Sequence, residues 1–133
     1  MEQPQRVAIY GGTFDPVHRG HLAIARQVST LFDIDEFLFV PARVAPHKLN
    51  REVSSALHRY AMLALATKDD PRLRISTAEI NGPGTQYTVD TLSHFRARFG
   101  DAAELFFVLG ADSWLDWCWR IDLSNFARQR ANV

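Results

Sequence analysis

The feature that most constrains the fold of this chain is a short apolar run that ends in two glycines and leads to a pair of histidines. Residues 7–10 are β-forming and apolar, so they predict a strand. Gly11 and Gly12 tolerate positive φ and place no Cβ between the backbone amides and a ligand. His18 and His21, three positions apart, are expected on one face of the first turn of a helix, where free N–H groups and the helix dipole favour an anion. The stretch therefore predicts a phosphate site.

Gly20 separates the two histidines and is expected to leave that face of the helix open to a ligand. A zinc site is a second interpretation of the histidines, but metal pairs on helices more often use i, i+4 spacing with a Glu between the ligands. The single cysteine and the absence of a third clustered histidine or acid argue against zinc. A pair of ordinary surface histidines is a further alternative. Asp15 is expected to fix the turn rather than to bind a metal.

Length and composition predict one domain of a globular protein. The chain has 133 residues, of which 47% are hydrophobic and 23% are charged. It contains no run of eighteen apolar residues and no recognisable signal peptide, so we expect a cytoplasmic protein without a membrane partner. One cysteine, Cys118, excludes an internal disulfide. Fifteen basic and fifteen acidic residues give zero net charge, which argues against a nucleic-acid partner.

Helical and strand patterns alternate along the chain. Apolar runs predict strands over residues 7–10, 37–40, 73–76 and 105–109. The first helix is expected over about residues 19–32, and its inward face is Leu22, Ala25, Val28 and Phe32. A second helix is capped by Ser54 or Ser55 and is expected to turn inward Leu57, Ala61, Ala64 and Leu65. A third helix is capped by Thr88, precedes Gly100, and packs through Val89, Leu92, Phe95 and Phe99.

This alternation predicts an α/β fold, in which a parallel Rossmann-like sheet is flanked by helices. The simplest strand order is 3-2-1-4, with residues 73–76 at an edge and a switch point between strands 1 and 4. Gly11 and Gly12 leave strand 1 there, and Gly110-Ala111-Asp112 leaves strand 4. The topology is therefore expected to bring the two glycine turns together.

Basic residues gather between positions 43 and 59, which include the long connection after the second strand. Glu52 is the single acid in this segment, and the cations are Arg43, His47, Lys48, Arg51, His58 and Arg59. A solvated loop and helix face is one interpretation. A clamp on a small anionic substrate is the other, because loops at the carboxyl ends of strands carry function.

The segment from Gly11 to His21 resembles the G-x-F-D-P-x-H-x-G-H signature of the nucleotidyltransferase superfamily. Within it the chain resembles the bacterial nicotinate-nucleotide adenylyltransferases, because the related pantetheine-phosphate adenylyltransferases usually carry Thr at the position of His18. The resemblance implies adenylyl transfer from ATP to nicotinate mononucleotide, which gives deamido-NAD and pyrophosphate in NAD biosynthesis. It implies Mg²⁺ that is bound mainly through the ATP phosphates, with no metal ligand from the protein.

The resemblance also assigns residue roles. Catalytic contacts to phosphate fall on His18, His21 and Lys48, the last in a Pro46-His47-Lys48 match to the P-H-K loop. Binding of ATP and its phosphates falls on Gly11, Gly12, Thr13, Phe14, Gly110 and Asp112. Residues 86–92 resemble the S-Y-T-x-D-T-L motif, so nicotinate mononucleotide binding falls on Tyr87 and Thr88, with Trp119 stacked on the pyridine ring. Trp117 is the alternative to Trp119, and core or interface packing is the alternative role for these tryptophans.

The chain departs from the resemblance mainly at its end. Ala42 and Ala45 replace an Asn and a Pro of the family pattern. After Asp122 nothing resembles the I-S-S/T-x-x-R motif, so we expect a nucleotidyltransferase domain over residues 1–120, truncated at its C-terminus, and a polar tail over 121–133. We also expect an open edge at strand 4, through which the chain could form a homo-oligomer. A non-catalytic nucleotide-binding remnant and a sister enzyme that acts on pantetheine phosphate are the alternative functions.

Overall fold

The computed structural model describes residues 3–43, 54–82, 88–109 and 117–121, the side chains of residues 88, 89, 109 and 117–121 excepted. The strands are β1 (Arg6–Gly12), β2 (Glu36–Pro41), β3 (Leu73–Ile75), β4 (Glu104–Leu109) and β5 (Trp117–Ile121). The helices are α1 (Arg19–Leu31), α2 (Ala56–Thr67) and α3 (Thr88–Phe99). The three predicted helices and the four predicted strands are confirmed, although Thr88 begins α3 rather than preceding it.

The strands form one sheet in the order β3-β2-β1-β4-β5, and β3, β2, β1 and β4 are parallel. The predicted order 3-2-1-4 is therefore confirmed. Gly11 pairs with Val40 on one side and with Leu109 on the other, so β1 runs through both glycines instead of ending before them. We call the end of the sheet where β1, β2 and β4 finish the carboxyl edge, and the end where they begin the amino edge.

The expected open edge at strand 4 is wrong. β5 pairs antiparallel with β4, from Leu105 opposite Ile121 to Leu109 opposite Trp117. Residues 117–121 are rich in β-forming types, which is the sequence signal for this strand. Antiparallel pairing requires only a short connection, so the chain can return beside β4 directly. The backbone hydrogen bonds of that edge are thereby satisfied.

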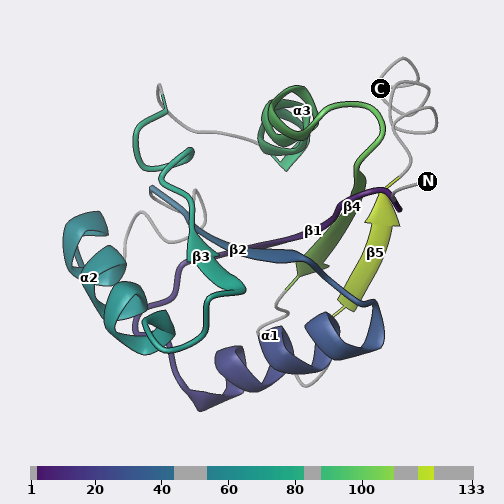
Figure 1. Cartoon of the computed structure of the whole chain (residues 1–133). Helices are drawn as coiled ribbons and strands as arrows, with labels where there is room; N and C mark the ends of the chain where they lie inside the picture. Colours follow the sequence, from purple (N-terminus) through teal and green to yellow (C-terminus); the bar gives the residue numbers. More distant parts are fainter. Residues whose placement is uncertain (1–2, 44–53, 83–87, 110–116, 122–133) are drawn as a thin grey trace.

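Helices cover both faces of the sheet. In Figure 1, where the sheet is seen nearly edge-on, α1 and α2 lie on one side of it and α3 lies on the other. Two cores result. Beneath α1 and α2 the buried residues are Ala8, Tyr10, Phe14, Ala25, Val28, Ile34, Phe37, Phe39, Leu63, Leu73, Phe106 and Val108. Beneath α3 they are Val7, Ile9, Leu38, Val40, Leu92, Phe95, Ala103, Leu105 and Phe107. Successive residues of β1 alternate between the two cores, as a strand buried on both faces requires.

The predicted inward face of α1 is confirmed. Ala25 and Val28 are buried, and Leu22 and Phe32 pack against the same core. In α3, Leu92 and Phe95 are buried, and Phe99 packs beside them; the side chain of Val89 lies outside the description. The 3.6-residue period therefore identified the packed face of both helices.

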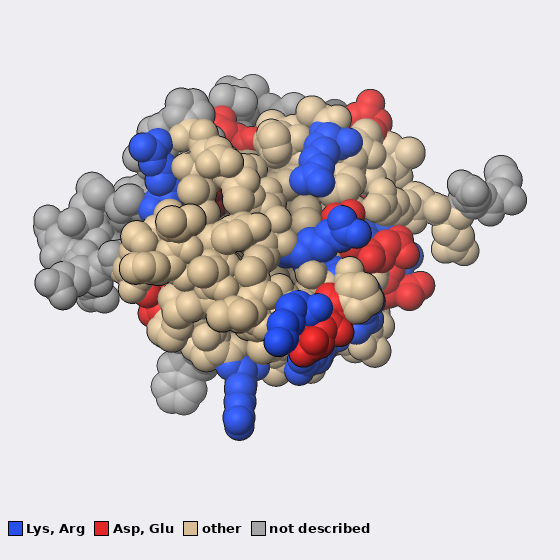
Figure 2. Space-filling view, turned by 60° about the vertical axis from the view of Figure 1, so that its left-hand side comes forward, with Lys and Arg blue, Asp and Glu red and all other residues tan. Residues whose placement is uncertain are grey.

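The predicted inward face of α2 is wrong. Leu57 and Leu65 are 76% and 69% exposed, and the residues that α2 buries are Arg59, Leu63 and Thr67. Figure 2 brings this side of the molecule forward and shows a broad area that carries no charged side chain. Arg59, Leu63 and Thr67 each follow a predicted inward position by two residues, so the buried side of α2 is nearly opposite to the predicted one.

Candidate active site

The two histidines build the start of α1, where His18 is exposed and His21 is half-buried. His18 is the N-cap residue, and its Nδ1 accepts a hydrogen bond from the Gly20 N–H at 3.0 Å. The Nδ1 of His21 accepts from the His18 N–H, also at 3.0 Å, which closes a reciprocal capping box. A neutral imidazole that accepts at Nδ1 carries its proton on Nε2. Both neutral rings are therefore oriented as Nε2–H donors.

The two rings stack, and aromatic residues hold one of them. Their centroids are 3.8 Å apart, with 28° between the ring planes. His21 also meets the rings of Phe14 and Tyr10 edge-on, at 5.0 and 6.0 Å. Burial, and to a smaller extent the neighbouring His18, lowers the pKa of His21 from 6.5 to about 4. His21 is therefore a neutral hydrogen-bond donor at pH 7, whose orientation is fixed by both a hydrogen bond and packing.

Gly20 does not leave the helix face open, as the sequence suggested. A Cβ on Gly20 would lie 2.8 Å from Cε1 and 3.0 Å from Nδ1 of His18, so the His18 ring occupies the space that the missing side chain provides. The expectation of free N–H groups at this helix start is also wrong in part, because the N–H groups of His18 and Gly20 are bonded to the imidazoles. An anion here would meet imidazole N–H groups in their place.

Phe14, in the turn after β1, has a left-handed backbone conformation, and its ring contacts His21. A Cβ on Gly12 would lie 3.2 Å from Cζ of Phe14, a tight contact that the ring could relieve only by shifting by a few tenths of an ångström. Phe14 has a φ of 51°, in the left-handed region that non-glycine residues seldom adopt. Its ring is buried against Tyr10 and Phe39. Packing of this side chain thus holds the backbone of the turn in an uncommon conformation.

Asp15 fixes this turn to the beginning of α2. One of its carboxylate oxygens, Oδ2, accepts a hydrogen bond from the Ser54 N–H at 2.9 Å. Ser55 caps α2, as predicted, because its hydroxyl accepts from the His58 N–H at 3.2 Å. The role expected for Asp15, fixing the turn, is therefore confirmed.

Arg59 is the residue that the sequence did not place in the site. It is 1% exposed, and its guanidinium donates to four carbonyls, with one bond from Nε to Ser54 at 2.9 Å. Nη1 donates to Thr13 at 2.9 Å and Ala42 at 2.7 Å, and Nη2 donates to Arg43 at 3.0 Å. The sequence signal that distinguishes it from the other basic residues of its segment is the resemblance of residues 55–62 to an S-x-x-x-R-x-x-M helix of the same family pattern.

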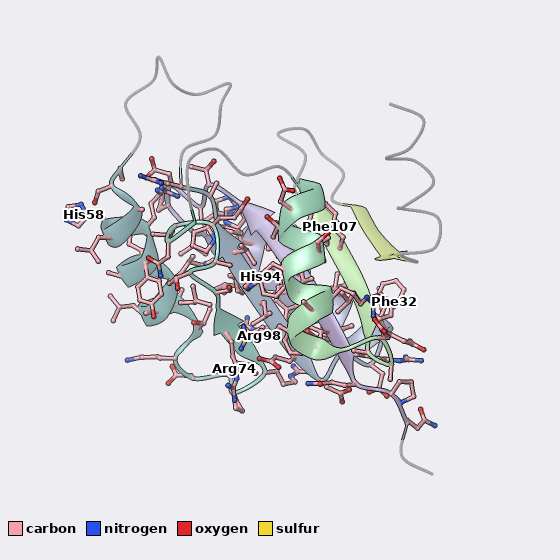
Figure 3. The ribbon with its side chains drawn as sticks, turned by 90° about the horizontal axis from the view of Figure 1, so that it is seen from above. Phe32, His58, Arg74, His94, Arg98 and Phe107 are labelled. Atoms are coloured by element: carbon pink, nitrogen blue, oxygen red, sulfur yellow. The ribbon has the colours of Figure 1, made fainter. Side chains whose placement is uncertain are left out.

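The basic residues between positions 43 and 59 divide into different roles. Arg59 is buried, whereas His58 lies on the outer side of α2 and points away from the sheet (Figure 3). Arg43 donates from Nη1 to the Gly82 carbonyl at 2.9 Å, which joins the segment after β2 to the one before α3. Neither of the two simple interpretations, a solvated surface or a clamp, fits all three residues.

Several predicted site residues lie outside the description. These are Lys48, Tyr87, Gly110 and Asp112, together with the side chains of Thr88 and Trp119. The roles assigned to these residues remain predictions.

The described part of the chain shows neither a metal-binding cluster nor a membrane-spanning helix. Among its His, Cys, Asp and Glu side chains, no three gather closely enough to hold a metal ion. No helix in the described ranges combines the length and apolarity that crossing a bilayer requires.

Comparison with known proteins identifies the family. The family model described as cytidylyltransferase-like matches residues 9–130. The chain belongs to this family. Its fold is similar to that of solved structures of the Plasmodium falciparum nicotinic acid mononucleotide adenylyltransferase. The structure complexed with NaAD has a TM-score of 0.62 and 20% sequence identity, and the match covers 80% of this chain and 51% of that one. The structure complexed with APC has a TM-score of 0.58 and 21% identity.

Curated relatives in the family carry the name probable nicotinate-nucleotide adenylyltransferase. The one from Thermoanaerobacter sp. (strain X514) is 45% identical over 116 residues, which are 87% of this chain and 55% of that protein. The one from Moorella thermoacetica is 42% identical over 116 residues, or 87% of this chain and 54% of the relative. The one from Mycobacterium bovis is 43% identical over 126 residues, or 90% and 58%. The chain thus spans a little over half the length of these relatives.

Proposed function

We propose that this chain transfers the adenylyl group of ATP to nicotinate mononucleotide, forming deamido-NAD and pyrophosphate. The observation that carries the proposal is the pair of Nε2–H donors that His18 and His21 hold beside the glycine turn. The names of relatives that are 42–45% identical over most of the chain support the choice of substrate. ATP and the mononucleotide are charged metabolites, so the proposed place of action is the cytoplasm.

The reaction we propose needs no covalent intermediate. A phosphate oxygen of nicotinate mononucleotide attacks the α-phosphorus of ATP in line, the new P–O bond forms, and the bond from that phosphorus to the bridging oxygen breaks to release pyrophosphate. The attacking phosphate is already an anion, so no strong base is required. What the chemistry requires is positioning and stabilisation of negative charge in the transition state.

We assign that stabilisation to His18 and His21. A neutral His21 donates its Nε2–H to a phosphate oxygen without releasing a proton, since its pKa of about 4 keeps the ring uncharged at pH 7. The backbone N–H groups from Gly12 to Phe14 and the ammonium of Lys48 are proposed as further phosphate contacts. Because the capping bonds fix the ring planes before substrate arrives, little reorganisation is needed during the reaction.

Magnesium is proposed to arrive with ATP rather than to occupy a site built by the protein. Asp15 is engaged with the Ser54 N–H, and each histidine uses Nδ1 for a backbone bond. These residues suit phosphate better than a hard cation, which prefers several oxygen ligands. When bound to the triphosphate, Mg²⁺ neutralises charge on its oxygens.

Pyrophosphate release by the purified chain tests the proposal. With ATP, Mg²⁺ and nicotinate mononucleotide we expect pyrophosphate and deamido-NAD in equal amounts, and little pyrophosphate without the mononucleotide. Pantetheine phosphate supplied in competition identifies a sister enzyme if it is the acceptor used. Binding of ATP·Mg without pyrophosphate from any acceptor would contradict catalysis and would favour a nucleotide-binding remnant.

A further inference from the structure

Arg59 controls the direction in which the glycine turn presents its amides. The C=O and N–H of a trans peptide point in opposite directions. Because the Thr13 carbonyl bonds to Nη1 of Arg59, the N–H of the same peptide unit, which belongs to Phe14, points away from the guanidinium. Among the described residues this N–H donates no hydrogen bond, and Phe14 as a whole is 3% exposed. Amides of this kind normally have a partner, so the Phe14 N–H is available for a ligand.

The same guanidinium fixes the chain where it leaves the next strand. Nη1 also bonds to the Ala42 carbonyl, and Nη2 bonds to the Arg43 carbonyl, both just beyond the end of β2. One planar group therefore sets the backbone at the carboxyl ends of two neighbouring strands, β1 and β2.

Stability alone is a poor reason for this arrangement. Burial of a guanidinium is costly, and apolar residues of similar size often replace buried charges without loss of stability. A rigid fork with five N–H donors is, however, the side chain best suited to hold several carbonyls at fixed angles. Lysine has the same charge but donates from a single point. The choice of arginine is thus explained by geometry.

We propose that Arg59 is a positioning residue of the phosphate site, which aims the Phe14 N–H at the bound phosphate and holds the start of the basic segment beside it. The proposal rests on the proposed function in that the anion is the triphosphate of ATP or the pyrophosphate product. It extends that function, because Arg59 acts without touching the substrate.

Matched substitutions of two arginines test this role. Arg96 also bonds to carbonyls, those of Gly100 and Ala103, but it does so at the amino edge. We expect Arg59→Lys and Arg96→Lys both to lower the thermal midpoint. Only Arg59→Lys should lower kcat, on the order of 10²-fold, with a much smaller change in KM for the mononucleotide. A kcat that falls equally in both variants, or in neither, would overturn the proposal.

Nuclear magnetic resonance gives a measurement that does not depend on turnover. The probe is inorganic pyrophosphate, added to ¹⁵N-labelled chain. We expect it to shift the Phe14 amide signal downfield in the wild type and in Arg96→Lys, and to leave that signal nearly unmoved in Arg59→Lys. An identical shift in all three proteins would contradict the assignment, whatever the activities.

The two measurements separate this inference from the proposed function. If the wild type releases no pyrophosphate from any acceptor, but pyrophosphate shifts the Phe14 amide only where Arg59 is present, the transferase proposal fails and the role of Arg59 stands. If the wild type is active and both lysine variants behave alike, Arg59 is structural only. Should Arg59→Lys fail to fold, the wild type decides, since a Phe14 amide that saturating pyrophosphate leaves unmoved refutes the proposal.

Discussion

The two ends of the sheet differ in the ion pairs that their described side chains make. At the amino edge Arg6 pairs with Glu104 at 3.2 Å, and Arg74 pairs with Glu36 at 3.8 Å. At the carboxyl edge the contacts are hydrogen bonds between side chains and backbone, made by the two histidines, Asp15 and Arg59. The ion pairs found among described residues all lie toward the amino edge, where the strands begin.

Ion pairs of this kind contribute to the stability of the fold, whereas directional hydrogen bonds also fix the orientation of the groups that they join. Solvated ion pairs tolerate a range of distances and stabilise a protein by about 0–1 kcal/mol each. Hydrogen bonds from a planar group to a carbonyl, or from an amide to an imidazole nitrogen, fix direction as well as distance. The contacts named above at the edge that we assign to phosphate chemistry are of the second kind; the amino edge combines ion pairs with such bonds, for example those of Arg96.

Removal of one imidazole at the carboxyl edge should have the largest effect. We expect His21→Ala to lower kcat on the order of 10² to 10³-fold, the usual loss for one donor to a developing charge. His94→Ala is the control, because His94 is exposed on α3 (Figure 3) and should leave kcat unchanged. Steady-state pyrophosphate release measures both. A His21→Ala protein that is folded and fully active would falsify the role of this ring.

A pair of glycines sharpens the contrast. In Gly20→Ala the new Cβ would meet the His18 ring at 2.8 Å, so the ring must leave its position, and we expect about a ten-fold fall in kcat. Gly100 follows α3 at the amino edge with a φ of 87° and open space around it. Gly100→Ala should cost about 1 kcal/mol of stability and no activity. Urea unfolding and kcat are measured on both variants. A loss of kcat in Gly100→Ala, with none in Gly20→Ala, would contradict this prediction.

Acid should weaken the fold through His21. Its pKa is about 4 in the folded chain and near 6.5 when unfolded, so between these pH values the unfolded chain binds the extra proton. The contribution is fully present above pH 6.5 and is lost as the pH falls toward 4. After allowance for solvent screening we expect a loss on the order of 1 kcal/mol. In urea unfolding at pH 7, 6 and 5, the free energy of unfolding should fall less in His21→Gln than in the wild type. An equal fall with pH in both proteins would exclude His21 as the cause.

The smallest effect is expected from an ion pair of the amino edge. Arg74 is 66% exposed where it pairs with Glu36, so Arg74→Ala should change the free energy of unfolding by less than about 0.5 kcal/mol. Kcat should stay at the wild-type value. A loss of activity in this variant would show that the two edges are coupled more strongly than their contacts suggest.

The sequence predicted three helices, four of the five described strands and the order of those four, because these follow from patterns that repeat. Unbroken apolar runs such as residues 105–109 require burial on both faces, and the parallel connections then leave few possible topologies. The wrong predictions concern single residues whose burial differs from what is usual for their residue type. Arg59 counts as a surface residue in any hydrophobic pattern, yet it is 1% exposed and lies on the buried side of α2 with Leu63 and Thr67.

Sequence spacing predicted that the two histidines lie together, but it did not predict how the start of α1 is built; the site roles stay predictions. His18, His21 and the glycine turn are side by side, as their spacing indicated. That His18 would cap the helix, and that Gly20 would make room for its ring, could not be predicted, because histidine is not among the preferred capping residues. β5 was missed because a tryptophan-rich segment after a glycine turn fitted a ligand shelf equally well.

The capping box made of two histidines has a consequence for protein engineering. A routine stabilising substitution would place Ser or Asp at position 18, where a better helix cap is available from standard residues. Such a variant would tighten the first turn of α1 and at the same moment discard one of the two rings that the proposed chemistry uses. At position 18, a substitution that raises thermal stability is therefore expected to lower kcat. Directed evolution for heat resistance should retain His18 only when activity is selected as well.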